Sequence, residues 1–189
     1  MSNAGAVKTG KGINALDLVY ISIGAALIAV CSWISIPTAV PFTLQTFAIF
    51  LVLLLLGGKR GTAATLIYVL LGAVGAPVFA GFTGGIGILF GSTGGYIWGF
   101  LFIGLIYMLF TRVFKESIVI QIAALVLGLA VCYGFGTVWF MHVYIRSSGE
   151  VGLLAVLGWC VFPFIVPDLI KLALAVEIAK RIKPVIKTM

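Results

Sequence analysis

The chain has 189 residues, of which 62% are apolar and only 9% are charged, whereas soluble proteins average about 25% charged residues. One small core cannot bury that apolar surplus, so lipid must solvate much of it. A helix needs about 20 residues to cross the hydrocarbon. We therefore expect one integral membrane domain over residues 1–189, with an N-terminal tail of residues 1–14 that could be partly tag-derived, and no soluble appendage.

The net charge of +7 is explained by membrane topology better than by nucleic-acid binding. Basic residues cluster at the ends of apolar runs, as the positive-inside rule requires of cytoplasmic loops. The three cysteines are isolated within apolar segments, without the spacing of metal ligands. The basic clusters are Lys8/Lys11, Lys59/Arg60, Arg112/Lys115 and Lys180/Arg181/Lys183/Lys187.

The apolar runs predict an all-α fold of six transmembrane helices with both termini inside. Only this count puts every basic cluster on one side of the membrane. The expected spans are, in chain order, residues 15–33, 44–56, 62–74, 94–110, 118–144 and 167 to the basic tail, with a re-entrant or interfacial segment at 152–162.

Three segments rich in proline or glycine, at residues 34–43, 75–93 and 145–166, are expected to be irregular and to lie outside. Irregular backbone near membrane depth persists only where it is buried in protein or lines a cavity. The short second and third spans leave room for such packing. The pattern therefore predicts a pocket at the outer face, covered by loops.

Asp168 and Lys171 are the strongest candidates for ligand binding. They are three residues apart at the expected start of the last span, so they share one helix face. An ionisable pair at membrane depth is costly unless it is matched, and usually marks a functional site. The alternative is structural, because Asp168 could cap that helix and pair with Lys171.

The other polar and aromatic candidates are individually ambiguous. Thr43 and Gln45, at the start of the second span, could bind a ligand amide or satisfy loop carbonyls. Gly84 and Gly85 could present N–H groups or make tight turns. Aromatic residues such as Phe79 and Tyr96 could stack on a ring, although packing is the better explanation for each of them individually.

A stripe of small residues in the first span, which comprises Ser22, Ala25, Ala26 and Ala29, is the candidate surface for a partner subunit. Ala25 and Ala29 are four residues apart, which lets another helix backbone approach closely. Packing inside the bundle is the alternative.

Four motifs, in this order and spacing, resemble the BioY family, the biotin-specific S components of energy-coupling factor (ECF) transporters. The resemblance spans about residues 15–180. Ser92 replaces the proline usual in the third motif, and Val166-Pro167 stands where Pro-Gly often precedes the aspartate. The motifs are Val40-Pro41-Phe42-Thr43-Leu44-Gln45-Thr46, Gly72-Ala73-Val74-Gly75-Ala76-Pro77-Val78-Phe79, Gly91-Ser92-Thr93-Gly94-Gly95-Tyr96 and Phe162-Pro163-Phe164-Ile165-Val166-Pro167-Asp168-Leu169-Ile170-Lys171.

The resemblance implies the six-helix S-component fold, with a biotin site facing outside in the cell membrane. It places Asp168 and Lys171 against the ureido ring and implies no cofactor. Its partners would be a transmembrane coupling (T) subunit, two ABC-type ATPase subunits and membrane lipid. The remaining expected ligand residues are Thr43, Gln45, Phe79, Thr83, Gly84, Gly85, Thr93 and Tyr96.

Three other functions stay open at this point. An S component for another small vitamin would show the same pattern. A membrane-embedded enzyme is disfavoured, because His142, the only histidine, has no nearby acid or serine in the sequence to form a catalytic set. A self-sufficient transporter would be expected to show internal repeats or proton-coupled carboxylates, and only Glu177 points that way.

Overall fold

The computed structural model describes residues 14–38, 40–114, 117–149 and 151–187. The predicted N-terminal tail therefore lies outside the described residues except for Asn14. The elements are α1 (Ala15–Trp33), β1 (Ser35–Ile36), β2 (Phe42–Thr43), α2 (Gln45–Ala73), the 3-10 turn η1 (Ala80–Phe82), α3 (Ile86–Phe90), α4 (Gly94–Val113), α5 (Ile118–Ser148), α6 (Leu153–Cys160) and α7 (Phe162–Lys187).

Five helical segments in the described part of the chain are long and apolar enough to cross a membrane: α1, α2, α4, α5 and a segment that joins α6 to α7. The helical membrane architecture expected from the sequence is thus present. The count of six depends on α2, which occupies both the second and the third predicted spans. Six crossings, and cytoplasmic termini, stay predictions.

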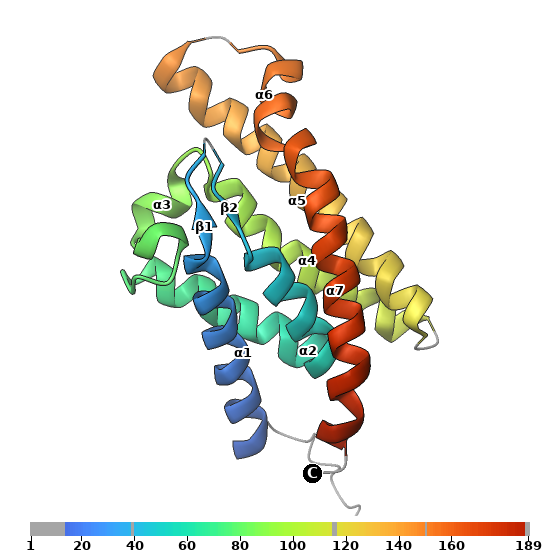
Figure 1. The fold of residues 1–189 in the computed structure, drawn as a ribbon. Helices are drawn as coiled ribbons and strands as arrows, with labels where there is room; N and C mark the ends of the chain where they lie inside the picture. The colour runs from blue at the N-terminus through green and yellow to red at the C-terminus, as the bar shows by residue number, and fades with distance from the viewer. Residues whose placement is uncertain (1–13, 39, 115–116, 150, 188–189) are drawn as a thin grey trace, which may run out of the picture.

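Gly57 explains why one helix stands where two were expected. Its backbone angles are φ 78° and ψ 172°, so α2 leaves helical geometry there. Only glycine adopts this region readily, because a Cβ would clash. The chain reverses at this point (Figure 1). Close packing continues beyond the bend, since a Cβ on Gly61 would lie 2.9 Å from the Cα of Leu53.

The segments expected to be irregular contain short regular elements. Residues 34–43 form a two-stranded antiparallel hairpin, in which Ser35 pairs with Thr43 and Ile36 with Phe42. The fold is therefore helical with a small hairpin rather than purely α. Residues 75–93 contain η1 and α3. Backbone pairing satisfies polar groups that would be costly to leave unpaired near the membrane.

The last helix begins earlier than predicted. α7 starts at Phe162 and runs through Pro167, whereas the sequence placed Pro167 in its first turn. Residues 145–166 are likewise mostly helical, in the end of α5, α6 and the start of α7. Proline cannot donate an N–H to the preceding turn, and the helix continues in spite of that loss. Asp168 therefore lies well inside α7, and the helix-cap interpretation is wrong.

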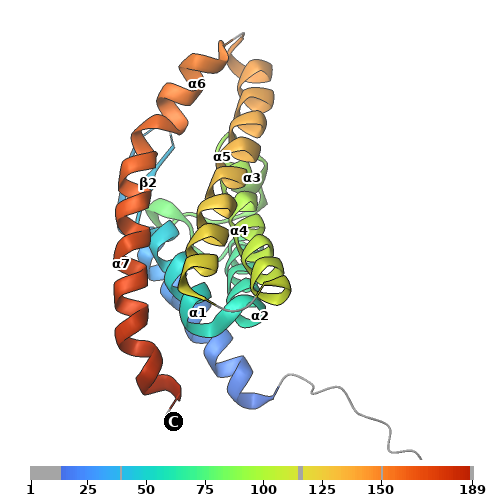
Figure 2. The same ribbon diagram turned by 90° about the vertical axis from the view of Figure 1, so that its right-hand side faces the viewer.

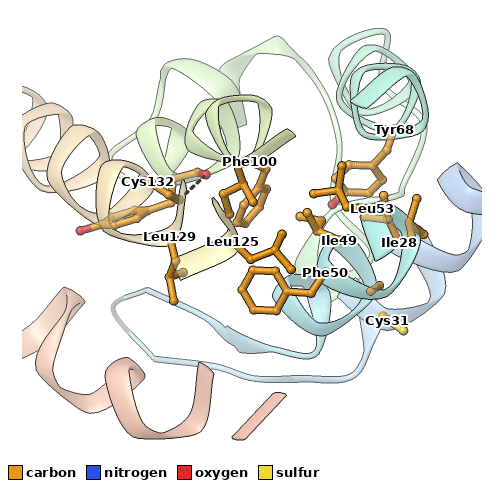
Figure 3. Close-up of a cluster of buried hydrophobic side chains, with 14 of the residues drawn as sticks. Ile28, Cys31, Ile49, Phe50, Leu53, Tyr68, Phe100, Leu125, Leu129 and Cys132 are labelled. Carbon is orange, nitrogen blue, oxygen red and sulfur yellow. Dashed lines mark hydrogen bonds between the residues drawn. The ribbon is translucent and has the colours of Figure 1, made fainter. Parts of the chain in front are cut away.

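Small residues let α4 and α5 pack closely. A Cβ added to Gly99 of α4 would lie 3.1 Å from the Cα of Cys132, and one added to Gly128 of α5 would lie 2.9 Å from the Cα of Ile103. Membrane helices commonly associate through such small residues. The buried cluster that follows includes Phe50, Phe100 and Leu125 (Figure 3).

The two ends of the molecule differ. The start of α1 and the end of α7 lie at one end, whereas the hairpin, α3 and α6 lie toward the other (Figure 1). α7 runs along one side of the bundle and packs mainly on α2 (Figure 2). The segments predicted to cover a pocket are thus gathered at the end away from the start of α1 and the end of α7.

Candidate ligand site

A cavity of about 290 Å³ lies below the hairpin, between α2, α4, α5 and α7. This volume is at the lower limit of typical small-molecule sites, about 300 Å³. Most of the wall is apolar. The lining residues are Val40, Pro41, Thr43, Gln45, Thr46, Phe79, Ala80, Thr83, Ile88, Thr93, Tyr96, Ile97, Phe100, Leu129, Cys132, Tyr133, Cys160, Phe164, Asp168 and Lys171.

Eight of the ten residues expected to bind ligand line this cavity, although they come from distant parts of the chain. Asp168 and Lys171 are its charged members, and they are 2% and 6% exposed. The others are neutral. The eight are Thr43, Gln45, Phe79, Thr83, Thr93, Tyr96, Asp168 and Lys171.

Asp168 is held by three donors from three helices. Lys171 Nζ lies 2.8 Å from Asp168 Oδ1, and Thr46 Oγ1 donates to the same oxygen at 2.8 Å. Tyr133 Oη donates to Asp168 Oδ2 at 2.5 Å. A carboxylate offers about four lone-pair sites, so one acceptor position is left after these three bonds.

Lys171 uses all three of its ammonium donors. Besides Asp168, Nζ donates to the backbone oxygen of Thr43 at 2.6 Å and to Thr46 Oγ1 at 3.3 Å. The ammonium also lies 4.3 Å from the centroid of the Phe42 ring, where a cation–π attraction operates. Lys171 thereby joins α7 to the hairpin and to α2.

Gln45 and Thr43 support the wall next to this pair. Gln45 Nε2 donates to Tyr68 Oη at 2.6 Å, and the Gln45 backbone N–H donates to Thr43 Oγ1 at 3.2 Å. Tyr96, on α4, is close to Thr137 of α5, with 3.3 Å between the hydroxyl oxygens. These contacts fix the side chains in orientation within an otherwise apolar wall.

The loop after α2 closes another side of the cavity. Phe79 N donates to the Thr83 backbone oxygen at 2.9 Å, and Ser32 Oγ of α1 donates to the oxygen of Val78 at 2.5 Å. The Phe79 ring meets Tyr68 edge to face at 5.6 Å. It also covers Gly72, where a Cβ would lie 2.0 Å from the ring.

A scan against protein families matches residues 4–188 to the BioY family. This chain belongs to the BioY family. A biotin transporter BioY of Thermotoga maritima is 45% identical over 171 residues, which cover 88% of this chain and 95% of that protein. A probable biotin transporter BioY of Pyrococcus horikoshii is 39% identical over 172 residues, 90% of this chain and 98% of that one.

A solved structure agrees with this membership. A crystal structure of the S component for biotin from an ECF-type ABC transporter superposes with a TM-score of 0.75 at 28% sequence identity, and it covers 89% of this chain and 91% of that chain. The fold described above is therefore an S-component fold, and the cavity lies in a BioY protein.

Gly84 and Gly85 are not among the lining residues of this BioY cavity. The Gly85 N–H donates to the backbone oxygen of Gly72 at 2.7 Å, and its φ of +104° favours glycine. A Cβ on Gly84 would lie 2.2 Å from the oxygen of Ala76. Both glycines therefore serve the turn in this structure, and contact with a ligand stays a prediction.

The sequence did not identify Tyr133 as a site residue, because a tyrosine within the long apolar run of α5 carries no motif of its own. A buried carboxylate needs more than one hydrogen-bond donor, and this requirement could have prompted a search for a hydroxyl in the long α5. Cys132, Cys160 and Phe164 were also missed as wall residues. Their apolar surroundings in the sequence give no local signal that separates cavity wall from core.

The small-residue stripe of α1 is divided between two faces. Ala25 and Ala29 are buried against the bundle, whereas Ser22 and Ala26 are exposed. A Cβ on neighbouring Gly24 would lie 3.0 Å from the Cβ of Ala64, so this side of α1 packs tightly on α2. Only Ser22 and Ala26 of the stripe are available for the docking role expected of it.

Proposed function

We propose that this BioY protein captures biotin as the S component of an ECF transporter. The observation that carries the proposal is the buried Asp168–Lys171 pair, 2.8 Å apart, at an apolar cavity of about 290 Å³. Biotin is a small bicyclic urea with an apolar thioether ring and a valerate tail. Its polar urea group matches the Asp168–Lys171 pair, and its apolar thioether ring matches the apolar lining of the cavity.

The urea group would exchange hydrogen bonds with the pair. A urea has one acceptor oxygen and two N–H donors. One of its N–H groups would donate to the acceptor position that is left on the carboxylate of Asp168. Its oxygen would replace the longest bond of Lys171, the 3.3 Å contact with Thr46. Charge-assisted bonds of this kind are about twice as strong as neutral ones.

The ring and tail would occupy the rest of the cavity. Val40, Phe100 and Leu129 offer apolar surface for the thioether ring. Thr83 is an exposed lining residue, whereas Asp168 is almost fully buried. We therefore place the urea at the buried pair and the valerate toward the loop that carries Thr83.

Transport requires partners in this proposal. A coupling T subunit and two ABC-type ATPase subunits would energise uptake across the cell membrane, with the site facing outside. The ECF-type transporter named for the solved neighbour supports this arrangement. The protein itself would act as a transporter subunit rather than an enzyme, with biotin as cargo and no cofactor.

Titration calorimetry of biotin into the purified, detergent-solubilised protein tests the proposal. Biotin should bind one per protein, and desthiobiotin, which keeps the urea ring, should displace it. Vitamins without a cyclic urea, such as thiamine or nicotinic acid, should not compete. Absence of biotin binding by the folded protein, or tighter binding of another vitamin, would overturn the proposal.

A further inference from the structure

Tyr133 of α5 lines the cavity and bonds to the carboxylate that is proposed to meet the urea. Its hydroxyl donates to Asp168 Oδ2 at 2.5 Å, whereas Lys171 and Thr46 both donate to Oδ1, each at 2.8 Å. Each carboxylate oxygen offers about two lone-pair positions. Oδ1 is therefore filled, and the acceptor position that is left belongs to Oδ2, the oxygen that Tyr133 holds.

The orientation of this carboxylate depends on a donor to each of its oxygens. The last side-chain torsion of an aspartate is broad, so bonds to Oδ1 alone would let the carboxylate plane turn. Asp168 is almost fully buried, so bulk water does not orient it. The Tyr133 hydroxyl fixes Oδ2, and with it the direction in which the remaining lone pair points.

The same bond joins two walls of the cavity that pack on different helices. Among the described residues, α5 packs mainly on α4 and α7 mainly on α2, whereas direct packing between α5 and α7 is sparse. Leu129 and Tyr133, four residues apart on one face of α5, line the cavity. Phe164 and Asp168 do the same from α7. The Tyr133–Asp168 bond therefore sets how far the α5 wall stands from the carboxylate.

We propose that Tyr133 is a positioning residue for biotin recognition, whose hydroxyl holds the Asp168 carboxylate so that its remaining acceptor position faces a urea N–H. This inference rests on the proposed function and extends it, because it assigns the aim of the carboxylate to α5. A tyrosine has one hydroxyl hydrogen, and Tyr133 gives it to Asp168. It therefore acts on the urea through Asp168 and not as a second donor to the urea oxygen.

A cycle of variants, measured by biotin calorimetry on the intact, detergent-solubilised protein, tests the inference. Tyr133→Phe removes the hydroxyl but keeps the ring, and it should weaken biotin binding roughly fivefold to thirtyfold, the equivalent of about 1–2 kcal/mol. In the Asp168→Asn background the same change should alter the affinity less than about threefold, because a neutral amide oxygen accepts a weaker bond and changes to one shared interaction are not additive. Tyr20→Phe, a matched change in α1 outside the cavity, should bind biotin like the wild type.

The outcomes separate this inference from the proposed function. Failure of the wild type to bind biotin would overturn both. Unchanged affinity in Tyr133→Phe, beside weakened binding in Asp168→Asn, would overturn the positioning role and leave the function intact, even if the ligand-free variant melted at a lower temperature. An equal loss in both backgrounds would also overturn it, because the hydroxyl would then act independently of Asp168.

The double variant Tyr133→Phe/Asp168→Asn decides the matter if Tyr133→Phe alone does not fold, as judged by gel filtration. It leaves no buried carboxylate short of a donor. Affinity within about threefold of that of Asp168→Asn would support the inference, because the hydroxyl then matters little once the charge is gone. A larger loss would overturn it.

Discussion

Asp168 brings together three helices at one carboxylate, through Thr46 of α2, Tyr133 of α5 and Lys171 of α7. Taking a charge out of water is costly unless it is paired and hydrogen-bonded. The pair meets this condition without a ligand. Its role in binding is therefore tested by changes that keep shape but remove charge.

We expect Asp168→Asn to weaken biotin binding by roughly tenfold to a thousandfold, the equivalent of about 1.5–4 kcal/mol. The amide keeps one acceptor oxygen but loses the negative charge that strengthens the bonds to the urea N–H groups. Calorimetry on the folded variant measures the change.

Lys171→Met should weaken binding to a similar extent, because it removes the donor to the urea oxygen but keeps an unbranched apolar chain. Circular dichroism and gel filtration would show whether each variant is folded. Wild-type affinity in both variants would show that the pair is structural only.

At the scale of elements, the bend in α2 depends on one residue. Gly57→Ala should destabilise the protein by about 1–3 kcal/mol, because a Cβ is strained at φ 78° and ψ 172°. The melting temperature should fall by roughly 2–4 °C for each kcal/mol. Gly158→Ala is a suitable control, since Gly158 lies in α6 with nothing within 4 Å of an added Cβ. Equal melting temperatures for the two variants would contradict this account.

The sequence predicted the helices because long apolar runs and basic ends are local signals. It also predicted eight residues that line the cavity, most clearly Asp168 and Lys171, because an ionisable pair in an apolar run is a strong local signal. The sequence predicted a loop between two helices at Gly57-Gly58, because a glycine pair also fits a short loop. It could not show that α2 continues as one helix with a bend there. The early start of α7 was missed because Pro167 is a common first-turn residue, and only the tertiary structure shows the helix running through it.

For the whole molecule, the proposed outward orientation of the site predicts which loops are accessible from outside the cell. A cysteine at Thr83 should react with an impermeant thiol reagent in intact cells, and biotin should protect it. A cysteine at Lys59, an exposed residue next to the α2 bend, should react only in inside-out vesicles. Wild-type protein sets the background, because its three cysteines are buried. The reverse pattern of labelling would invert the topology.

Docking to a coupling subunit is predicted to use the exposed side of α1. Ala26→Trp should leave biotin binding intact in the isolated protein but prevent ATP-dependent uptake and co-purification with partners, because its bulk keeps a second helix away. Ala25→Trp, one residue earlier but 3% exposed, should instead disturb the bundle itself. Normal uptake by the Ala26 variant would mean that this face contacts only lipid.

The walls of the proposed biotin cavity come from both halves of the chain, from the hairpin near the start to α7 at the end. A ligand in this cavity contacts both halves of the chain, and it binds only when the protein is folded, because the unfolded chain has no cavity. Thermodynamic linkage then adds about 2.7 kcal/mol to the free energy of unfolding at a biotin concentration a hundred times the Kd. The supply of biotin would thus affect how long this subunit persists in the membrane as well as how much biotin it carries. In cells starved of biotin, the protein would be mostly ligand-free, and the ligand-free form unfolds and is degraded most readily.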